Sequence, residues 1–162
     1  MDEKVFKVLF VCTGNSCRSP MAEGILKDLL RKKGVENIAV ESAGIMAPVG
    51  AAPTDYAVLA MVENGIDISG HRSRPLTKKM VEEANLILVM EKIHLKFAEG
   101  LSRKAKGKVF LLKEFGEMAS GGEVADPIGS ELEVYRESRD ELEKEIRRIF
   151  PELLKLAQEN KC

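Results

Sequence analysis

One ten-residue segment near the N-terminus, VCTGNSCRSP at residues 11–20, constrains the fold of this chain more than any other. An apolar run of strand length and strand composition, residues 5–11, comes before it. After it, residues 21–30 repeat their large apolar side chains at the helical period. The sequence therefore predicts a strand, an eight-residue loop and a helix, with Cys12 at the start of the loop.

Each part of this loop suits a phosphate-like dianion. With Ser19 as the helix cap and Pro20 at the first helical position, the loop amides curl into a helix N-terminus and form an anion-binding nest. Gly14 allows a backbone conformation that a side chain would resist. Arg18 offers a planar fork of donors for two oxygens of a bound anion. The same donors would stabilise a Cys12 thiolate and lower its pKa, which makes Cys12 a candidate nucleophile.

The spacing of Cys12 and Arg18, with five residues between them, resembles the signature of cysteine-dependent phosphatases. The longer segment VCTGNSCRSPMAE, residues 11–23, is similar to the low-molecular-weight protein tyrosine phosphatase family. That family also contains bacterial protein arginine phosphatases and thioredoxin-linked arsenate reductases. The resemblance covers nearly the whole chain and extends to Ser42-Ala43-Gly44, His71, Leu86–Met90 and Asp126-Pro127.

Strand and helix signals alternate along the chain, which predicts a three-layer α/β domain with a parallel sheet. Strands are expected at residues 5–11, 38–42, 86–90 and 108–112, with helices between and after them. The resemblance implies four parallel strands in the order 2-1-3-4, flanked by helices, with the phosphate loop after strand 1. At 162 residues the chain is most simply one phosphatase domain, residues 1–162.

Asp126 is the candidate general acid. It precedes Pro127 in a long, glycine-bearing segment, residues 113–129, and loops of that length tend to be functional. An isolated Asp-Pro pair indicates only a turn. Beside a cysteine phosphate loop, and by the resemblance, it is predicted to protonate the leaving group and then to activate water against a phosphocysteine. The predicted catalytic residues are therefore Cys12, Arg18 and Asp126.

The resemblance also implies residues that support the loop. Asn15, Ser42 and His71 match positions that hydrogen-bond together and hold the phosphate loop in its strained shape. An isolated histidine would instead be read as a surface or core residue. Ser19 matches the hydroxyl that stabilises the thiolate. The whole loop is expected to bind phosphate, through Thr13, Gly14, Asn15, Ser16, Cys17, Arg18 and Ser19.

Cys17 has two interpretations. It could be a small buried hydrophobic residue. The resemblance implies instead that it pairs reversibly with Cys12 under oxidation and protects the nucleophile.

Composition excludes several other classes of function. With 25 basic and 26 acidic residues, the chain has no electrostatic signature for nucleic acid or an anionic membrane. The first apolar run is too short for a signal peptide or a membrane span. Three cysteines argue against a disulfide framework and predict a cytoplasmic protein. Two distant histidines and three cysteines form no recognisable metal-ligand set, so neither a metal nor another cofactor is expected. The expected partners are phosphorylated proteins and oxyanion inhibitors such as phosphate.

Substrate preference is predicted to favour phosphoarginine over phosphotyrosine. The position of Ser16 tends to be isoleucine in the tyrosine phosphatases and threonine in the arginine phosphatases, and a small polar side chain leaves room for a guanidinium-like leaving group. Ile128 follows Asp126-Pro127, where tyrosine phosphatases often carry aromatic residues. Residues 135–142 also look like the arginine-phosphatase branch. Ser16 nevertheless lacks the threonine methyl group.

Two alternatives stay open from the sequence. An arsenate reductase would share the loop, but its chemistry needs further thiols, and no cysteine lies between Cys17 and Cys162. A non-catalytic phosphate-binding module would need neither a nucleophile nor an acid, and the presence of both Cys12 and Asp126 argues against it.

Overall fold

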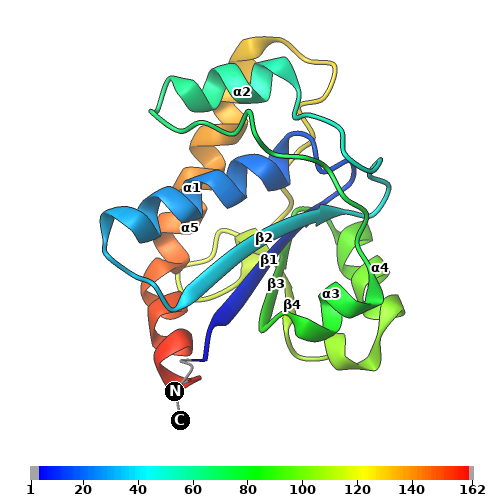
Figure 1. Ribbon diagram of the computed structural model, residues 1–162, viewed down its shortest axis with the longest axis vertical. Helices are drawn as coiled ribbons and strands as arrows, with labels where there is room; N and C mark the ends of the chain where they lie inside the picture. Colours follow the sequence, from blue (N-terminus) through cyan, green and yellow to red (C-terminus); the bar gives the residue numbers. More distant parts are fainter. Residues whose placement is uncertain (1–3, 161–162) are drawn as a thin grey trace.

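Four short apolar segments form a parallel sheet at the centre of the computed structural model, which describes residues 4–160 (Figure 1). The strands are β1 (Phe6–Cys12), β2 (Ile38–Gly44), β3 (Leu86–Val89) and β4 (Val109–Leu111). They are ordered β2-β1-β3-β4, and every neighbouring pair is parallel. The predicted fold class and strand order are confirmed. Cys162 lies outside the described residues.

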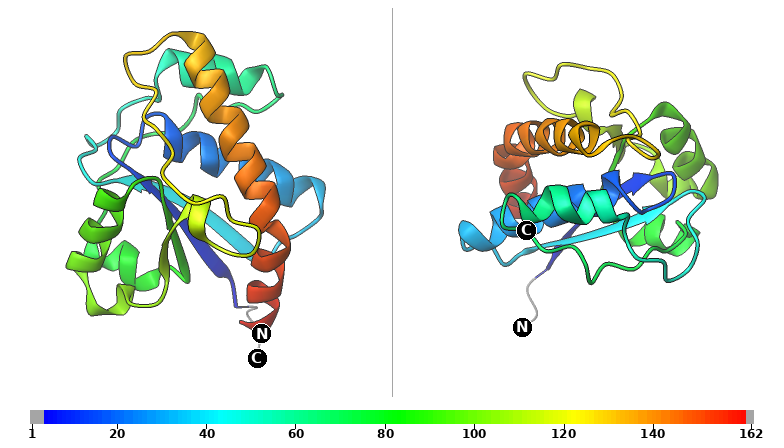
Figure 2. Two further views of the ribbon diagram at one scale, coloured as in Figure 1. Left: turned by 180° about the vertical axis from the view of Figure 1, so that it is seen from behind. Right: turned by 90° about the horizontal axis from the view of Figure 1, so that it is seen from above.

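Helices cover both faces of the sheet, so the side chains of β1 are buried on both sides. Phe6, Val8 and Phe10 belong to one core cluster, while Leu9 and Val11 belong to a second cluster on the opposite face. Figures 1 and 2 show α1 and α5 side by side on the first face and α3 and α4 on the second. The helices are α1 (Arg18–Lys32), α2 (Asp55–Val62), α3 (Lys78–Glu83), α4 (Lys92–Leu101) and α5 (Leu132–Glu159).

Among residues 4–160, no helix combines the length and the apolar character needed to cross a membrane.

The start of α1 differs from the prediction. The helix begins at Arg18, with Cys17 as its N-cap, so the prediction that Ser19 caps it is wrong. The Ser19 hydroxyl is engaged elsewhere: it contacts Cys12 Sγ at 2.9 Å and accepts from Asn15 Nδ2 at 2.8 Å. Pro20 still lies in the first turn, where a missing N–H leaves no helical bond unmade.

The end of β2 lies directly against the loop that joins β1 to α1. The amides of Ile45 and Met46 donate to the carbonyls of Cys12 and Thr13, at 3.0 and 2.9 Å. A Cβ added to Gly44 would collide with the Thr13 carbonyl oxygen and would lie 2.9 Å from the amide nitrogen of Asn15. Only glycine therefore allows the two segments to approach this closely.

We expect Gly44→Ala to lower the free energy of unfolding by about 1–3 kcal/mol, because the loop backbone must move to admit the methyl group. Gly100→Ala is the matched control, since Gly100 lies in α4 with open space around its Cα. Urea denaturation of the three proteins measures the effect. Equal stability of Gly44→Ala and the parent would contradict the close approach.

Candidate active site

The loop of residues 13–17 leaves the carboxyl end of β1, between β2 and β3 (Figure 1). In this strand order the connections from β1 and β3 run to opposite sides of the sheet, so the loop lies at the topological switch point, where open α/β sheets bind ligands. The loop continues directly into α1, whose N-terminal amides and dipole favour an anion.

The strained residue of the loop is Asn15, which has a φ of 54°. The expectation that Gly14 supplies the unusual conformation is wrong: its φ is not positive, and a Cβ there would meet only Ser16 Oγ, at 3.4 Å. The Asn15 side chain is held on three sides. Its Nδ2 donates to Ser19 Oγ and to Ser42 Oγ (2.8 and 3.0 Å), and its Oδ1 accepts the Arg74 amide (3.0 Å). Asparagine tolerates this conformation better than most residues do.

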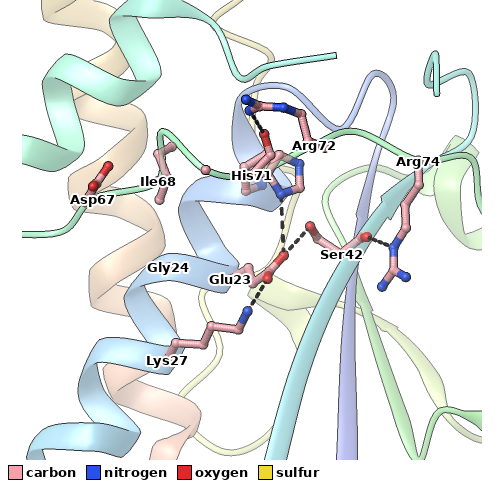
Figure 3. A pocket seen from close by; sticks show the side chains of 11 residues that line it. Glu23, Gly24, Lys27, Ser42, Asp67, Ile68, His71, Arg72 and Arg74 are labelled. Carbon is pink, nitrogen blue, oxygen red and sulfur yellow. Dashed lines mark hydrogen bonds and ion pairs between the residues drawn. The ribbon is translucent and has the colours of Figure 1, made fainter. Parts of the chain in front are cut away.

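Two of the three predicted support residues, Ser42 and His71, approach Glu23 (Figure 3). The third, Asn15, is joined to both of them by hydrogen bonds. Ser42 Oγ donates to Glu23 Oε1 at 2.5 Å, and His71 Nδ1 lies 3.9 Å from the same oxygen. His71 Nε2 lies 3.1 Å from the Asn15 carbonyl oxygen, which can only accept, so this nitrogen donates. Glu23 is the last residue of the motif at residues 11–23, and its role was not predicted from the sequence.

A hollow of about 450 Å³ opens beside these support residues (Figure 3). Glu23, Ser42, His71 and Arg74 line part of it. None of the three predicted catalytic residues, Cys12, Arg18 and Asp126, lines it.

The Cys12 thiol is buried, with 2% of the residue exposed. The Asn15 amide donates to its Sγ at 3.3 Å, and Ser19 Oγ lies 2.9 Å away. The expectation of a lowered pKa is wrong. Burial raises the pKa of Cys12 and outweighs the opposing effects of Ser19, the Arg18 charge and the Asn15 amide.

Arg18 joins the loop to the late segment that carries Asp126. Its guanidinium is 1% exposed, and Nη1 donates to Glu91 Oε2 at 2.6 Å and to the Val124 carbonyl at 2.8 Å. Its Nη2 lies 3.5 Å from Asp126 Oδ2. The Asp126 side chain is 37% exposed, and its Oδ1 accepts the Ile128 amide at 3.1 Å. The structure thus brings Asp126 to the Arg18 end of the loop.

Glu91 and His94 are two site residues that the sequence analysis missed. His94 is fully buried, and its Nδ1 accepts the Glu91 amide at 3.0 Å while Nε2 lies 2.9 Å from Thr13 Oγ1. Burial and the Arg18 charge lower the pKa of His94 to about 4, against the opposing carboxylates. The sequence offered one signal for these residues, which was their position along the chain. Glu91 follows the apolar run that forms β3, the neighbour of β1 at the switch point.

Cys17 lies on the other side of the loop. It is buried, and its Sγ contacts Thr54 Oγ1 at 3.4 Å and Tyr135 Oη at 3.5 Å. Cys12 and Cys17 are both free thiols, and their pairing under oxidation stays a prediction. Within residues 4–160, no three His, Cys, Asp or Glu side chains are grouped as metal ligands would be.

Ser19 is the group that opposes the effect of burial on Cys12 most strongly. We expect Ser19→Ala to move the midpoint of Cys12 alkylation by iodoacetamide to higher pH, because the thiolate loses a hydrogen-bond donor. Mass spectrometry reads the modified residue at each pH. Ser102→Ala, which removes a buried hydroxyl bonded to Glu82, serves as control. A midpoint that stays in place would contradict the role of Ser19.

The chain is similar to known proteins over most of its length. Residues 7–160 match the family model described as low molecular weight phosphotyrosine protein phosphatase. The protein-arginine-phosphatase of Bacillus subtilis is 40% identical over 148 residues, which is 91% of this chain and 97% of the relative.

Two solved structures are similar throughout. One is the YwlE arginine phosphatase as a cysteine-to-serine mutant with a phosphorylated active site serine, with a TM-score of 0.86, 40% identity, and 93% and 97% of the two chains covered. The other is a low molecular weight protein tyrosine phosphatase from T. tengcongensis, with a TM-score of 0.85, 38% identity, and 91% and 99% covered. The resemblance found in the sequence is confirmed: the chain belongs to the low molecular weight phosphotyrosine protein phosphatase family.

Proposed function

We propose that this protein is a phosphoprotein phosphatase that works through a phosphocysteine intermediate on Cys12. One observation carries the proposal: a buried cysteine at the carboxyl end of β1 shares a loop with Arg18, whose guanidinium lies 3.5 Å from Asp126. A nucleophile, a phosphate-binding cation and an acid thus occupy one site. The family match over residues 7–160 supports it, and it also supports one phosphatase domain over residues 1–162.

The reaction has two displacements. In the first, the Cys12 thiolate attacks phosphorus, an S–P bond forms, and the bond to the leaving atom breaks as protonated Asp126 donates its proton to that atom. In the second, the Asp126 carboxylate takes a proton from water, which attacks phosphorus and breaks the S–P bond. Arg18 and the loop amides stabilise the charge on the three equatorial oxygens in both steps. The products are the dephosphorylated protein and inorganic phosphate.

Hydrolysis is favoured over the two alternatives considered from the sequence. The relatives carry phosphatase names, and one mutant relative holds a phosphate on its active site serine. An arsenate reductase would need a relay thiol, and the chain has no cysteine between Cys17 and Cys162. A pure phosphate-binding module would have no use for Asp126 beside Arg18.

Phosphoarginine proteins are the proposed preferred substrates. Ser16 has a small polar side chain, and Ile128, 58% exposed, follows Asp126-Pro127 without an aromatic side chain. The relatives from Bacillus subtilis and Geobacillus stearothermophilus are named protein-arginine-phosphatases, at 40% and 39% identity. A cytoplasmic location, as predicted from cysteine usage, fits such substrates. Phosphate and related oxyanions are the proposed inhibitors.

Phosphotyrosine is the second candidate substrate. Tyr56 is 43% exposed and packs edge-to-face on Tyr135, with ring centroids 5.7 Å apart. Both tyrosines line a hollow of about 390 Å³ beside Gly129, three residues after Asp126. A phenol ring could therefore find an aromatic contact near the acid.

Substitution of the acid tests the mechanism. We expect Asp126→Asn to lower kcat on a phosphopeptide about 100- to 10,000-fold, the size of a lost general acid. The loss should be smaller with para-nitrophenyl phosphate, whose leaving group departs without a proton. Asp140→Asn, an exposed carboxylate on α5, is the control. Equal losses on the two substrates would argue against proton donation to the leaving group, and turnover by Cys12→Ser at the parent rate would contradict the phosphocysteine route.

Substitution at Ser16 tests the substrate preference. We expect the parent to have a higher kcat/KM for a phosphoarginine peptide than for a phosphotyrosine peptide. Ser16→Ile should reduce that ratio about tenfold or more, because a bulky apolar side chain fills the space for the guanidinium. Ser120→Ile, at an exposed serine, is the matched control. An unchanged ratio in Ser16→Ile would remove Ser16 as the determinant, and Tyr56→Ala would then test the phenol contact.

A further inference from the structure

We propose that His94 is a positioning residue for phosphoryl transfer, which holds Thr13 of the phosphate loop and Glu91 beside Arg18 in a fixed relation. The proposal rests on the proposed phosphatase function. It concerns a residue on α4, which the sequence motif of the loop does not include.

Both ring nitrogens of His94 have a defined partner. The Glu91 amide can only donate, so Nδ1, 3.0 Å away, must be the unprotonated nitrogen. The neutral ring then carries its proton on Nε2, which donates to Thr13 Oγ1 at 2.9 Å. His94 is fully buried, so water does not replace either contact at low cost.

The contact between His94 and Thr13 fixes the residue next to the proposed nucleophile, Cys12. Thr13 follows Cys12, and its carbonyl accepts the Met46 amide at 2.9 Å. The residue is therefore fixed through its backbone by the segment after β2 and through its side chain by α4. Fixing Thr13 on two sides also fixes the peptide planes next to it, whose amides would face a phosphoryl group bound in the loop. Amide donors stabilise the transition state most when they are oriented before the reaction begins.

The contact between His94 and Glu91 acts on Arg18, which is proposed to bind the transferred phosphoryl group. Glu91 is the N-cap of α4, and its carboxylate accepts Arg18 Nη1 at 2.6 Å. Because His94 Nδ1 binds the Glu91 amide, the same ring sets the start of α4 and, through it, the carboxylate that orients the guanidinium. One side chain thus links the two ends of the phosphate-binding loop.

The surroundings keep the ring in this form. Arg18 from α1, Glu91 at the start of α4, and Asp126 and Glu123 from the late loop all act on His94 electrostatically. A second proton would go to Nδ1 and face the Glu91 N–H, which would break that contact. The imidazole is therefore expected to stay neutral, with its proton on Nε2, across the pH range in which the enzyme works.

Asparagine and glutamine separate the two contacts. In His94→Asn the amide oxygen can replace Nδ1 as acceptor for the Glu91 amide, but the side chain is too short to reach Thr13. In His94→Gln the longer side chain brings an N–H donor to the place of Nε2. Thr13→Val removes the hydroxyl and leaves His94 in place.

We expect His94→Asn to lower kcat on para-nitrophenyl phosphate roughly tenfold or more, with KM changed less than about threefold, because the lost contact acts on the transition state. His94→Gln should restore kcat in part, because it returns a donor to Thr13 but not the acceptor for the Glu91 amide. Thr13→Val should match His94→Asn, and the double variant should be no slower than either single one. Circular dichroism melting checks that each variant is folded.

Parent-like kcat in His94→Asn, no rescue by glutamine, or losses that multiply in the double variant would each overturn the proposal. Nitrogen-15 NMR of the imidazole tests it without turnover: between pH 7 and pH 5 the Nε2–H neutral tautomer is expected, and the Nδ1–H tautomer or a charged ring would contradict it. The chain has two histidines, so His71→Gln assigns the signals. Absence of any phosphatase activity in the parent would instead refute the proposed function, and the NMR result would stand apart from it.

Discussion

The left-handed backbone of Asn15 is the constraint on which the site depends. Such a conformation is unfavourable for a residue with a side chain, and it persists only when its surroundings fix it. Here β2 supplies Ser42, and the segment between α2 and α3 supplies His71 and Arg74. The parallel register pairs Phe10 with Ser42 and Cys12 with Gly44, so the sheet itself delivers these groups to the loop. The loop geometry is thus a property of the sheet, not of the loop sequence alone.

Burial and donor contacts act against each other at Cys12. A buried thiol resists ionisation, and the Ser19 hydroxyl, the Arg18 charge and the Asn15 amide only partly offset that effect. The Ser19 hydroxyl contacts Cys12 Sγ from inside the first turn of α1, where the residue is not the helix cap. The helix begins at Arg18, two residues before Pro20, where it would have started with Ser19 as its N-cap.

The features that were predicted from the sequence are local, and the residues that were missed contact the loop from positions far along the chain. The β1–loop–α1 unit is local, so periodicity and loop composition were sufficient, and the family resemblance added the strand order. Glu91 and His94 reach Arg18 and Thr13 across 73 and 81 positions. Their immediate sequence shows only that they follow the apolar run of β3, because their role arises where β3 ends beside β1. Gly14 was over-interpreted for the converse reason: a glycine in a loop does not by itself have a positive φ.

The charges around Arg18 bear on the order of proton transfers in the two proposed displacements. One guanidinium faces the carboxylates of Glu91 and Asp126, at 2.6 and 3.5 Å. A phosphoryl dianion in the loop would add two further negative charges to the same cation, which one arginine cannot balance. Glu91 is held closely, with Oε2 2.6 Å from Nη1, whereas Asp126 Oδ2 lies 3.5 Å from Nη2; the two side chains are similarly exposed, at 31% and 37%. Asp126 is therefore the carboxylate held less closely by Arg18, and in the proposed first displacement it is the group that gives the leaving atom its proton. Once the leaving group has taken it, the ionised carboxylate faces a phosphocysteine and can draw the next proton from water.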